Sequence, residues 1–156
     1  RTLAGFIGDI SYAQSNRERY EGFCQALADA GKKVDSSLCL TTPLGIDTYR
    51  EEIDTFLSSL SRMPDAFVCA SDYVACILMQ LLEKRGLRVP EDVAVSGFDN
   101  NTEDLLAEHL TTVQVFNEEL GARLALQILY RIKYPNTPHE ITYLGTNVLY
   151  RDSTGD

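Results

Sequence analysis

Residues 64–75 read PDAFVCASDYVA, and this short stretch decides the class of fold. Its proline ends the helical pattern before it, because proline disfavours helix in the preceding residue. Residues 66–70 are apolar throughout, which is typical of a strand in a parallel sheet that is covered on both faces. A helical spacing of apolar residues starts directly after Ser71 and Asp72 and ends at Gly86. A strand that runs straight into a helix indicates a βαβ unit.

The same alternation continues on both sides of this stretch. Further short strands are predicted at residues 3–8, 37–40, 93–98 and 111–116, with a last β stretch at 141–150. Helices are predicted at 15–31, 47–61 and 118–132, with a short acidic helix or turn at 102–109. The first of these helices opens on a capping-box pattern at residues 15–18 and ends at Gly31. The whole pattern predicts an α/β fold with a doubly wound parallel sheet.

The composition is that of a globular chain, with 156 residues of which 44 % are hydrophobic. The formal net charge is −9, from 14 basic and 23 acidic residues. This balance argues against contact of this segment itself with nucleic acid or an anionic membrane, since both repel negative charge. No apolar run approaches the roughly 20 residues that span a bilayer, and the first residues do not resemble a signal peptide. Because the chain starts at Arg1 rather than at Met, we expect it to be part of a longer protein.

The four cysteines, Cys24, Cys39, Cys69 and Cys76, lie in apolar stretches and form no CxxC pair. Their spacings match no zinc site, so we expect free, buried thiols that behave as small hydrophobic residues in a reducing cytoplasm. A catalytic cysteine would need a positioned base, and both histidines lie in polar, loop-like segments. We therefore expect no metal, no cofactor and no cysteine chemistry.

A doubly wound sheet places its ligand beyond the carboxyl ends of its strands. The residues that follow the predicted strands are therefore candidates for a binding site: Asp9 and Ser11, Ser71 and Asp72, and Phe98 and Asp99. Arg17 and Arg19, in the first turns of the first helix, add guanidinium groups. Carboxylates accept hydrogen bonds from hydroxyls, a guanidinium donates in a planar fork, and a phenyl ring offers a stacking face. This inventory favours recognition of a small polyol or similar polar metabolite over turnover.

Each candidate also has an ordinary structural explanation. Asp72 at a helix start is typical of a helix cap, and Asp99 after a strand is typical of a turn. Arg17 and Arg19 lie beside acidic residues and would ordinarily be solvated charges. Enzyme motifs are missing from the sequence, which has no GxGxxG after the first strand, no GxxxxGK[ST] loop and no GxSxG elbow. A receiver domain would need an acidic pair after the first strand, where this sequence has only Asp9.

Several segments together resemble the LacI/GalR-type transcription regulators. Residues 64–75 resemble the PDAIFAxNDxxA segment of that family, and residues 86–100, GLRVPEDVAVSGFDN, resemble its GxxVPxDVxVxGFDN segment. The strings RYEGF at 19–23, LTTV at 110–113 and RDST at 151–154 match further family motifs. The matches occur in family order over nearly the whole chain.

The resemblance implies the periplasmic-binding-protein-like fold of type I, in which two α/β subdomains enclose an effector cleft. Residues 1–112 would form the C-terminal subdomain, residues 113–138 an excursion that belongs to the N-terminal subdomain, and residues 139–156 the return and tail. If the partners of that excursion are absent, its helix exposes an apolar stripe. The stripe consists of Leu120, Leu124 and Ile128.

The resemblance also implies effector contacts for Arg19, Ser71 and Asp99, with Phe98 nearby. The strand-end rule adds Asp9 to this predicted ligand site. Ser71 stands where the family carries an asparagine, which replaces an amide by a shorter hydroxyl. The identity of the effector is therefore open.

In function, the resemblance implies no enzyme but the effector-sensing and dimerisation part of a bacterial repressor in the cytoplasm. A small polar metabolite, a sugar or sugar derivative, would change the angle between the subdomains and shift operator binding as a population shift. DNA would be contacted only through an upstream domain, and the helix at 72–85 with the loop at 100–109 would pair two copies in a homodimer. Two alternatives stay open: a periplasmic sugar-binding receptor of the same fold, and a small α/β enzyme.

Overall fold

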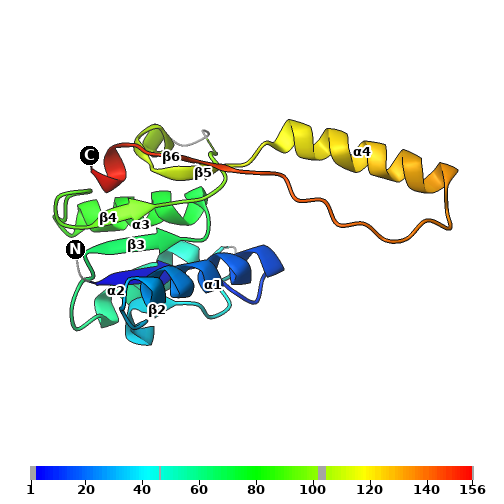
Figure 1. Cartoon of the computed structure of the whole chain (residues 1–156). Helices are drawn as coiled ribbons and strands as arrows, with labels where there is room; N and C mark the ends of the chain where they lie inside the picture. The colour runs from blue at the N-terminus through cyan, green and yellow to red at the C-terminus, as the bar shows by residue number, and fades with distance from the viewer. Residues whose placement is uncertain (1–2, 46, 102–104, 156) are drawn as a thin grey trace.

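A four-stranded parallel sheet forms the centre of the computed structural model, which describes residues 3–45, 47–101 and 105–155. The strands lie in the order β2-β1-β3-β4, with bounds Cys39–Leu40, Ala4–Ile7, Ala66–Cys69 and Ala94–Ser96 (Figure 1). Ala66 pairs with Ala4 on one side and with Ala94 on the other, so the central strand β3 is hydrogen-bonded on both edges. The predicted parallel α/β architecture is confirmed.

Helices cover both faces of this sheet. Helix α1 (Gln14–Asp29) lies on one face, where Phe23 packs with Phe6 of β1. Helices α2 (Tyr49–Ser59) and α3 (Asp72–Lys84) share the other face with the main core, which includes Ile7 and Phe67. Because consecutive strand residues point to opposite faces, β1 supplies Phe6 to one core and Ile7 to the other. This two-sided covering is the doubly wound arrangement that the sequence predicts.

Helix α3 carries most of the main core. Eight of its thirteen residues are buried: Asp72, Val74, Ala75, Cys76, Ile77, Leu78, Leu81 and Leu82. Ser71 caps the helix with its hydroxyl, which accepts a hydrogen bond from the Val74 N–H at 3.4 Å. Gly86 follows the helix with a φ of +72°, a backbone conformation that glycine adopts without steric cost.

The chain leaves the sheet through β5 (Thr112–Gln114), which extends it by isolated parallel bridges from Thr111 to Ser96 and from Gln114 to Asp99. Helix α4 (Asn117–Lys133) then projects away from the sheet (Figure 1), and the chain returns through β6 (Asn147–Leu149), antiparallel to β5. None of the seventeen residues of α4 is buried. Leu120, Leu124 and Ile128 are between 48 % and 62 % exposed, which confirms the predicted apolar stripe.

Within the described part of the chain, the remaining regular structure consists of three short 3-10 helices, Ser36–Leu38, Leu105–His109 and Asp152–Thr154. A short helix or turn was predicted at residues 102–109, and the second of these 3-10 helices, Leu105–His109, covers the end of that segment. Residues 102–104 of that segment lie outside the described residues. Strands were predicted at residues 37–40, 93–98 and 111–116. The structure has a shorter strand in each of these segments: Cys39–Leu40, Ala94–Ser96 and Thr112–Gln114.

Two local predictions are wrong. The capping box at residues 15–18 does not form, because α1 begins one residue earlier, at Gln14. The side-chain amide of Gln14 donates to Glu18 at 2.7 Å. The side-chain amide of Asn16 donates to the Asp9 carbonyl oxygen at 2.9 Å. The last β stretch is confined to Asn147–Leu149 instead of 141–150. A strand needs a neighbouring ladder, and β5 supplies one over only three residue pairs.

All four cysteines are free thiols, as predicted, but only Cys69 and Cys76 are buried, while Cys24 and Cys39 are partly exposed. Within residues 3–45, 47–101 and 105–155, no helix is both long and apolar enough to cross a membrane.

Candidate functional site

The loop after β1 is organised around the carboxylate of Asp9. Its Oδ1 accepts hydrogen bonds from the Ser11 N–H, the Ser11 hydroxyl and the Tyr12 N–H, at 2.8, 2.6 and 3.1 Å. Its Oδ2 accepts from the Leu44 N–H at 3.2 Å, which ties this loop to the one that leads into α2. Burial raises the pKa of Asp9, but these hydrogen bonds outweigh it and hold the pKa below its ordinary value. Asp9 is therefore a buried anion that shapes the sheet edge.

A second cluster at the same edge is centred on Arg19 of α1. Its guanidinium lies over the Phe98 ring, with 3.7 Å from Cζ to the ring centroid. Nη1 donates to the Ala70 carbonyl oxygen at 2.6 Å, and Nη2 lies 3.4 Å from Asp99 Oδ1. The structure thus brings together residues from α1, from the end of β3 and from the loop after β4. Arg17, two residues earlier, is exposed.

The Asp99 side chain remains open to solvent, with 42 % of its surface exposed. The pKa of Asp99 is raised above its ordinary value, and the main cause is the burial of part of the side chain. The positive charge of Arg19 opposes this shift, and the negative charge of Asp72 adds to it. At one place, therefore, the Asp99 carboxylate can accept hydrogen bonds from a polar ligand and the Arg19 guanidinium, stacked on Phe98, can donate them.

The backbone that presents Asp99 has an unusual conformation. Asp99 and Asn100 have φ angles of 108° and 53°, in the left-handed half of conformational space. Non-glycine residues there cost on the order of 1–3 kcal/mol and persist only where the surroundings hold them. Two hydrogen bonds do so, from Asp99 N–H to the Val113 carbonyl at 3.0 Å and from Asn100 N–H to the Thr112 hydroxyl at 3.3 Å.

Asp72 has a larger role than the helix cap that its position suggests. Its carboxylate is 2 % exposed and accepts from the Thr112 hydroxyl at 2.6 Å and from the Asn101 N–H at 2.7 Å. A Cβ at Gly97 would collide with this carboxylate, so glycine is required there. Burial raises the pKa of Asp72, and the hydrogen bond from Thr112 opposes that effect. Asp72 therefore joins the start of α3 to the Asp99 loop and to β5.

Ser71 caps α3 and follows Ala70, whose carbonyl oxygen binds Arg19. Its oxygen accepts from the helix, and its hydroxyl proton can be donated to a ligand. Of the five predicted site residues, Arg19, Phe98 and Asp99 are in direct contact, and Ser71 is the next residue in the chain after Ala70, which accepts from Arg19. Asp9 lies at the same sheet edge, but its hydrogen bonds from described residues come from Ser11, Tyr12 and Leu44.

The motif RDST at 151–154 fastens the returning chain to the sheet. Arg151 donates to the carbonyl oxygens of Ala107 and Leu110 at 3.0 and 2.9 Å and to Asn100 Oδ1 at 2.8 Å. Ser153 donates to the Val95 carbonyl at 2.6 Å and accepts from the Thr111 N–H at 2.8 Å.

The supporting roles of Asp72, Thr112 and Arg151 were not predicted. One signal could have indicated them: two adjacent threonines, 111 and 112, stand in a stretch where a strand buried on both faces would carry only apolar residues. Buried hydroxyls need partners, and those partners are the Asp72 carboxylate and the segment at 151–154.

The arrangement offers a polar ligand a donor, an acceptor and an aromatic face at one place. Across the residues that the structure describes, no group of three or more His, Cys, Asp or Glu side chains is placed to hold a metal ion. The parallel sheet, the loop cluster at its carboxyl edge and the antiparallel crossover β5–β6 define a ligand-binding domain of the periplasmic-binding-protein type.

Comparison with known proteins specifies this class further. The family model described as "Periplasmic binding protein-like domain" matches residues 2–154. The HTH-type transcriptional regulator DegA of Bacillus subtilis is 35 % identical over 121 residues, covering 77 % of this chain and 35 % of DegA. The HTH-type transcriptional repressor PurR of Photobacterium profundum is 29 % identical over 154 residues, covering 97 % of this chain and 46 % of PurR.

Among solved structures, a complex of the transcriptional regulator CelR with cellobiose matches with a TM-score of 0.86 and 29 % identity, covering 97 % of this chain and 46 % of that chain. The chain belongs to the LacI/GalR family of transcription regulators, and its fold is that of their effector-binding domain. Its relatives are regulators and not enzymes. The chain spans less than half of the length of the relatives named here.

Proposed function

We propose that this chain senses a small neutral metabolite, a sugar, and that the bound sugar changes operator binding by a DNA-binding domain elsewhere in the full-length protein. The observation that carries the proposal is the Arg19 cluster, in which one guanidinium stacks on Phe98 and faces the half-open Asp99 carboxylate. Paired donors and acceptors of this kind match the vicinal hydroxyls of a sugar. The cellobiose bound by CelR supports the sugar class.

Within this site, Arg19, Asp99 and Ser71 contact the effector and Phe98 lies beside it. Asp9 acts by holding the loop at the sheet edge, because its carboxylate already accepts four hydrogen bonds. Serine in place of an amide at position 71 shortens the reach of this group. The effector therefore sits closer to the start of α3, or a water bridges the gap.

The site is one half of a cleft. We assign residues 1–112 to the C-terminal subdomain, 113–138 to the excursion into the N-terminal subdomain and 139–156 to the return. The exposed apolar stripe of α4 supports this division, because a stripe of this size needs a partner in the mature fold. An effector that bridges both subdomains selects one angle between them, and the coupling to DNA is then a population shift.

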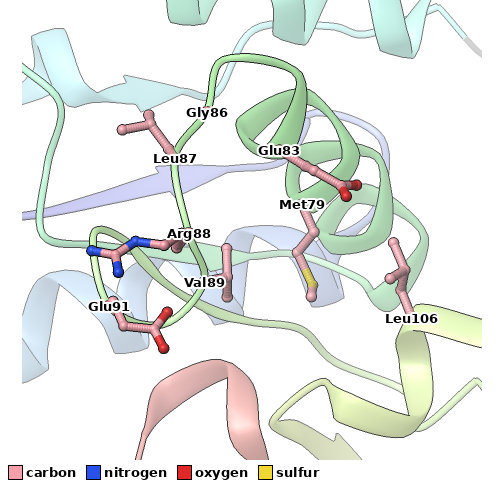
Figure 2. Close-up of a pocket in the computed structure, with 8 residues that line it drawn as sticks. All are labelled: Met79, Glu83, Gly86, Leu87, Arg88, Val89, Glu91 and Leu106. Carbon is pink, nitrogen blue, oxygen red and sulfur yellow. The ribbon is translucent and has the colours of Figure 1, made fainter.

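The full-length protein acts in the cytoplasm as a homodimer in which α3 and the 3-10 helix Leu105–His109 face a second copy. A groove of about 580 Å³ lies between the far end of α3 and the loop after it (Figure 2). Its apolar lining consists of Met79, Leu87, Val89 and Leu106, with Glu83, Arg88 and Glu91 at its rim. Apolar side chains within a charged rim are the composition of a protein interface.

The test uses the full-length protein in thermal-shift and calorimetric titrations with sugars, sugar phosphates and nucleobases. We expect a sugar to bind, and Arg19→Ala and Asp99→Ala each to weaken it by about 10- to 100-fold, the range for a hydrogen bond to a charged group. Arg17→Ala on the same helix is the matched control and keeps the affinity. Sedimentation equilibrium on the same samples measures the oligomeric state, and we expect a dimer.

A second readout tests the regulation. The bound sugar changes the affinity of the full-length protein for DNA that the protein selects from a genomic library. An effector that binds Arg19→Ala and Asp99→Ala as tightly as the unchanged protein would refute the site. A sugar that binds without any change in DNA affinity would refute the regulatory role.

A further inference from the structure

Three tyrosines lie at the carboxyl edge of the sheet, the edge that also carries the Arg19 cluster. Tyr12 follows β1, Tyr49 opens α2 and Tyr73 lies in the first turn of α3. Tyr12 is 72 % exposed and Tyr73 is 57 % exposed, which is a large solvent-facing area for aromatic side chains. Each of the three segments that carry them starts where a strand ends, so all of them adjoin the strand ends that form the ligand edge.

The contacts of Asp9 and Tyr49 hold these tyrosines near one another. The rings of Tyr49 and Tyr73 make an edge-to-face contact, with centroids 5.8 Å apart and an interplanar angle of 86°. Asp9 accepts from the N–H of Tyr12 with one oxygen and from the N–H of Leu44, in the loop before α2, with the other. Burial raises the pKa of Tyr49, and the nearby Asp9, Tyr12 and Tyr73 raise it further.

A groove begins at this aromatic rim. Tyr49 and Tyr73 line a hollow of about 390 Å³ between α2 and α3, within the roughly 300–1,000 Å³ of small-molecule sites. Its lining also includes Cys76 and Ile77 and the polar residues Asp47 and Gln80. Aromatic faces beside hydrogen-bonding groups suit a ring that is apolar on its faces and polar on its edge.

The charges around the rim disfavour an anionic ligand. Carboxylates lie around it: Asp47 and Glu51 line the hollow, and Asp9 and Glu52 lie near Tyr49. Among the described residues, Arg50 is the one cation in the lining of the hollow, where it donates to the neutral Gln80, and Arg19 is paired with Asp99. Negative charge therefore exceeds positive charge at this rim, which disfavours a phosphorylated sugar or a nucleotide relative to a neutral sugar.

From this geometry we propose that Tyr12, Tyr49 and Tyr73 form a second subsite, which stacks a further ring of a neutral disaccharide or longer saccharide whose first ring lies on the Arg19 cluster. The proposal rests on the proposed function and narrows its ligand from sugars in general to uncharged saccharides of two or more rings. Tyr49 positions Tyr73 by their edge-to-face contact, and the exposed faces of Tyr12 and Tyr73 receive the second ring.

The test is calorimetric titration of the full-length protein with cellobiose, maltose, lactose and sucrose, with glucose, galactose and fructose, and with glucose 6-phosphate. We expect one disaccharide to bind about fivefold more tightly than either of its component monosaccharides, since an aromatic contact contributes about 1 kcal/mol beyond burial. Glucose 6-phosphate binds more weakly than glucose.

The variants separate this subsite from the site on which it rests. Tyr73→Ala and Tyr12→Ala each lower the disaccharide affinity several-fold and leave the monosaccharide affinity unchanged, while Tyr73→Phe and Tyr12→Phe keep both. Arg19→Ala lowers the affinity for both kinds of sugar. The unchanged monosaccharide affinity of the alanine variants shows at the same time that they are folded.

Three results would overturn the subsite: equal affinity for a disaccharide and its monosaccharides, full disaccharide affinity in Tyr12→Ala and Tyr73→Ala, or tighter binding of glucose 6-phosphate than of glucose. Each of them leaves the sensing function intact, provided that Arg19→Ala still lowers the affinity for the sugar. Failure of every neutral sugar to bind would overturn the subsite and the proposed sugar class together.

Discussion

Helices α3 and α4 present the same sequence signal and meet opposite surroundings. Both carry apolar residues at helical spacing, yet eight of the thirteen residues of α3 are buried and none of the seventeen of α4 is. Helix α3 lies against a sheet that the chain itself supplies, whereas α4 projects beyond it (Figure 1). The apolar spacing therefore encodes the need for a partner surface and does not say what that surface is.

The contacts of α4 with its own segment are local. Arg131 donates to the Thr137 carbonyl, and Glu119 pairs with Arg123 at 2.9 Å one turn away. An isolated helix of this length is marginal in water, because nucleation is costly and packing normally supplies its stability. The comparison thus predicts a stable body and a weakly stabilised arm within one chain.

The largest effect that tests this comparison comes from one substitution made at both places. Leu78→Ala in α3, where the side chain is fully buried, lowers the free energy of unfolding of this chain by about 2–5 kcal/mol, because it removes core contacts and leaves a cavity. Leu124→Ala in α4, where the side chain is 62 % exposed, changes it by less than about 0.5 kcal/mol. Urea unfolding followed by circular dichroism measures both.

The full-length protein turns the same pair into a test of the domain division. If α4 packs into the N-terminal subdomain there, Leu124→Ala costs about 2 kcal/mol or more, as a buried leucine does. An equally small effect of Leu124→Ala in both settings would contradict the assignment of residues 113–138 to that subdomain. A large effect in this chain alone would contradict the exposed position of α4.

The sequence predicted the body well, because each of its elements buries its own apolar pattern within the chain. Residues 66–70 were expected to be a doubly covered strand, and β3 is paired on both edges with α1 and α2–α3 on its faces. The last β stretch was overestimated, since a strand of 141–150 needs a ladder that β5 supplies over only three pairs. Pairing of this kind depends on a partner and leaves no mark on the segment itself.

The candidate site was predictable in part for the same reason. The strand-end rule and the family resemblance selected Arg19, Phe98 and Asp99, which the structure brings into contact. The rule also selected Asp9, and it could not tell a carboxylate that is open to a ligand from one that holds a loop. The buried bonds of Asp72 to Thr112 and Asn101 escaped prediction, because they join segments that lie far apart in sequence.

A smaller effect concerns the place where the arm returns to the body. Ser153→Ala lowers the free energy of unfolding by about 1–3 kcal/mol, because it leaves the Thr111 N–H and the Val95 carbonyl buried without this partner. Ser59→Ala is the matched control: its hydroxyl is exposed and bonds to a helix carbonyl, and its loss costs less than about 0.5 kcal/mol. Equal unfolding midpoints for the two variants would refute the anchoring role of residues 151–154.

The smallest effect sharpens the comparison at the ligand edge of the body and depends on pH. The pKa of Asp9 is held below its ordinary value of 3.8, so the folded state binds the proton less readily than the unfolded state does. The stability that this carboxylate contributes is complete above about pH 5 and is lost as the pH falls through the ordinary value to the lowered one. When the pH is lowered from about 5 to about 3, we expect the unfolding midpoint of the unchanged chain to decrease by more than that of Asp9→Asn, because the variant has no carboxylate to protonate at this position.

Asp99→Asn gives the opposite sign and serves as the control for the Asp9 effect. The pKa of Asp99 is raised, so its folded state binds the proton more readily and its contribution to stability decreases as the pH rises through the ordinary value to the raised one. Asp99→Asn removes this opposing contribution, so the variant loses stability more steeply than the unchanged chain as the pH falls. If Asp9→Asn and the unchanged chain lost stability in parallel, the Asp9 hydrogen bonds would contribute nothing to holding the sheet edge. The loops that carry Tyr12 and lead to Tyr49 would then owe their positions to packing alone.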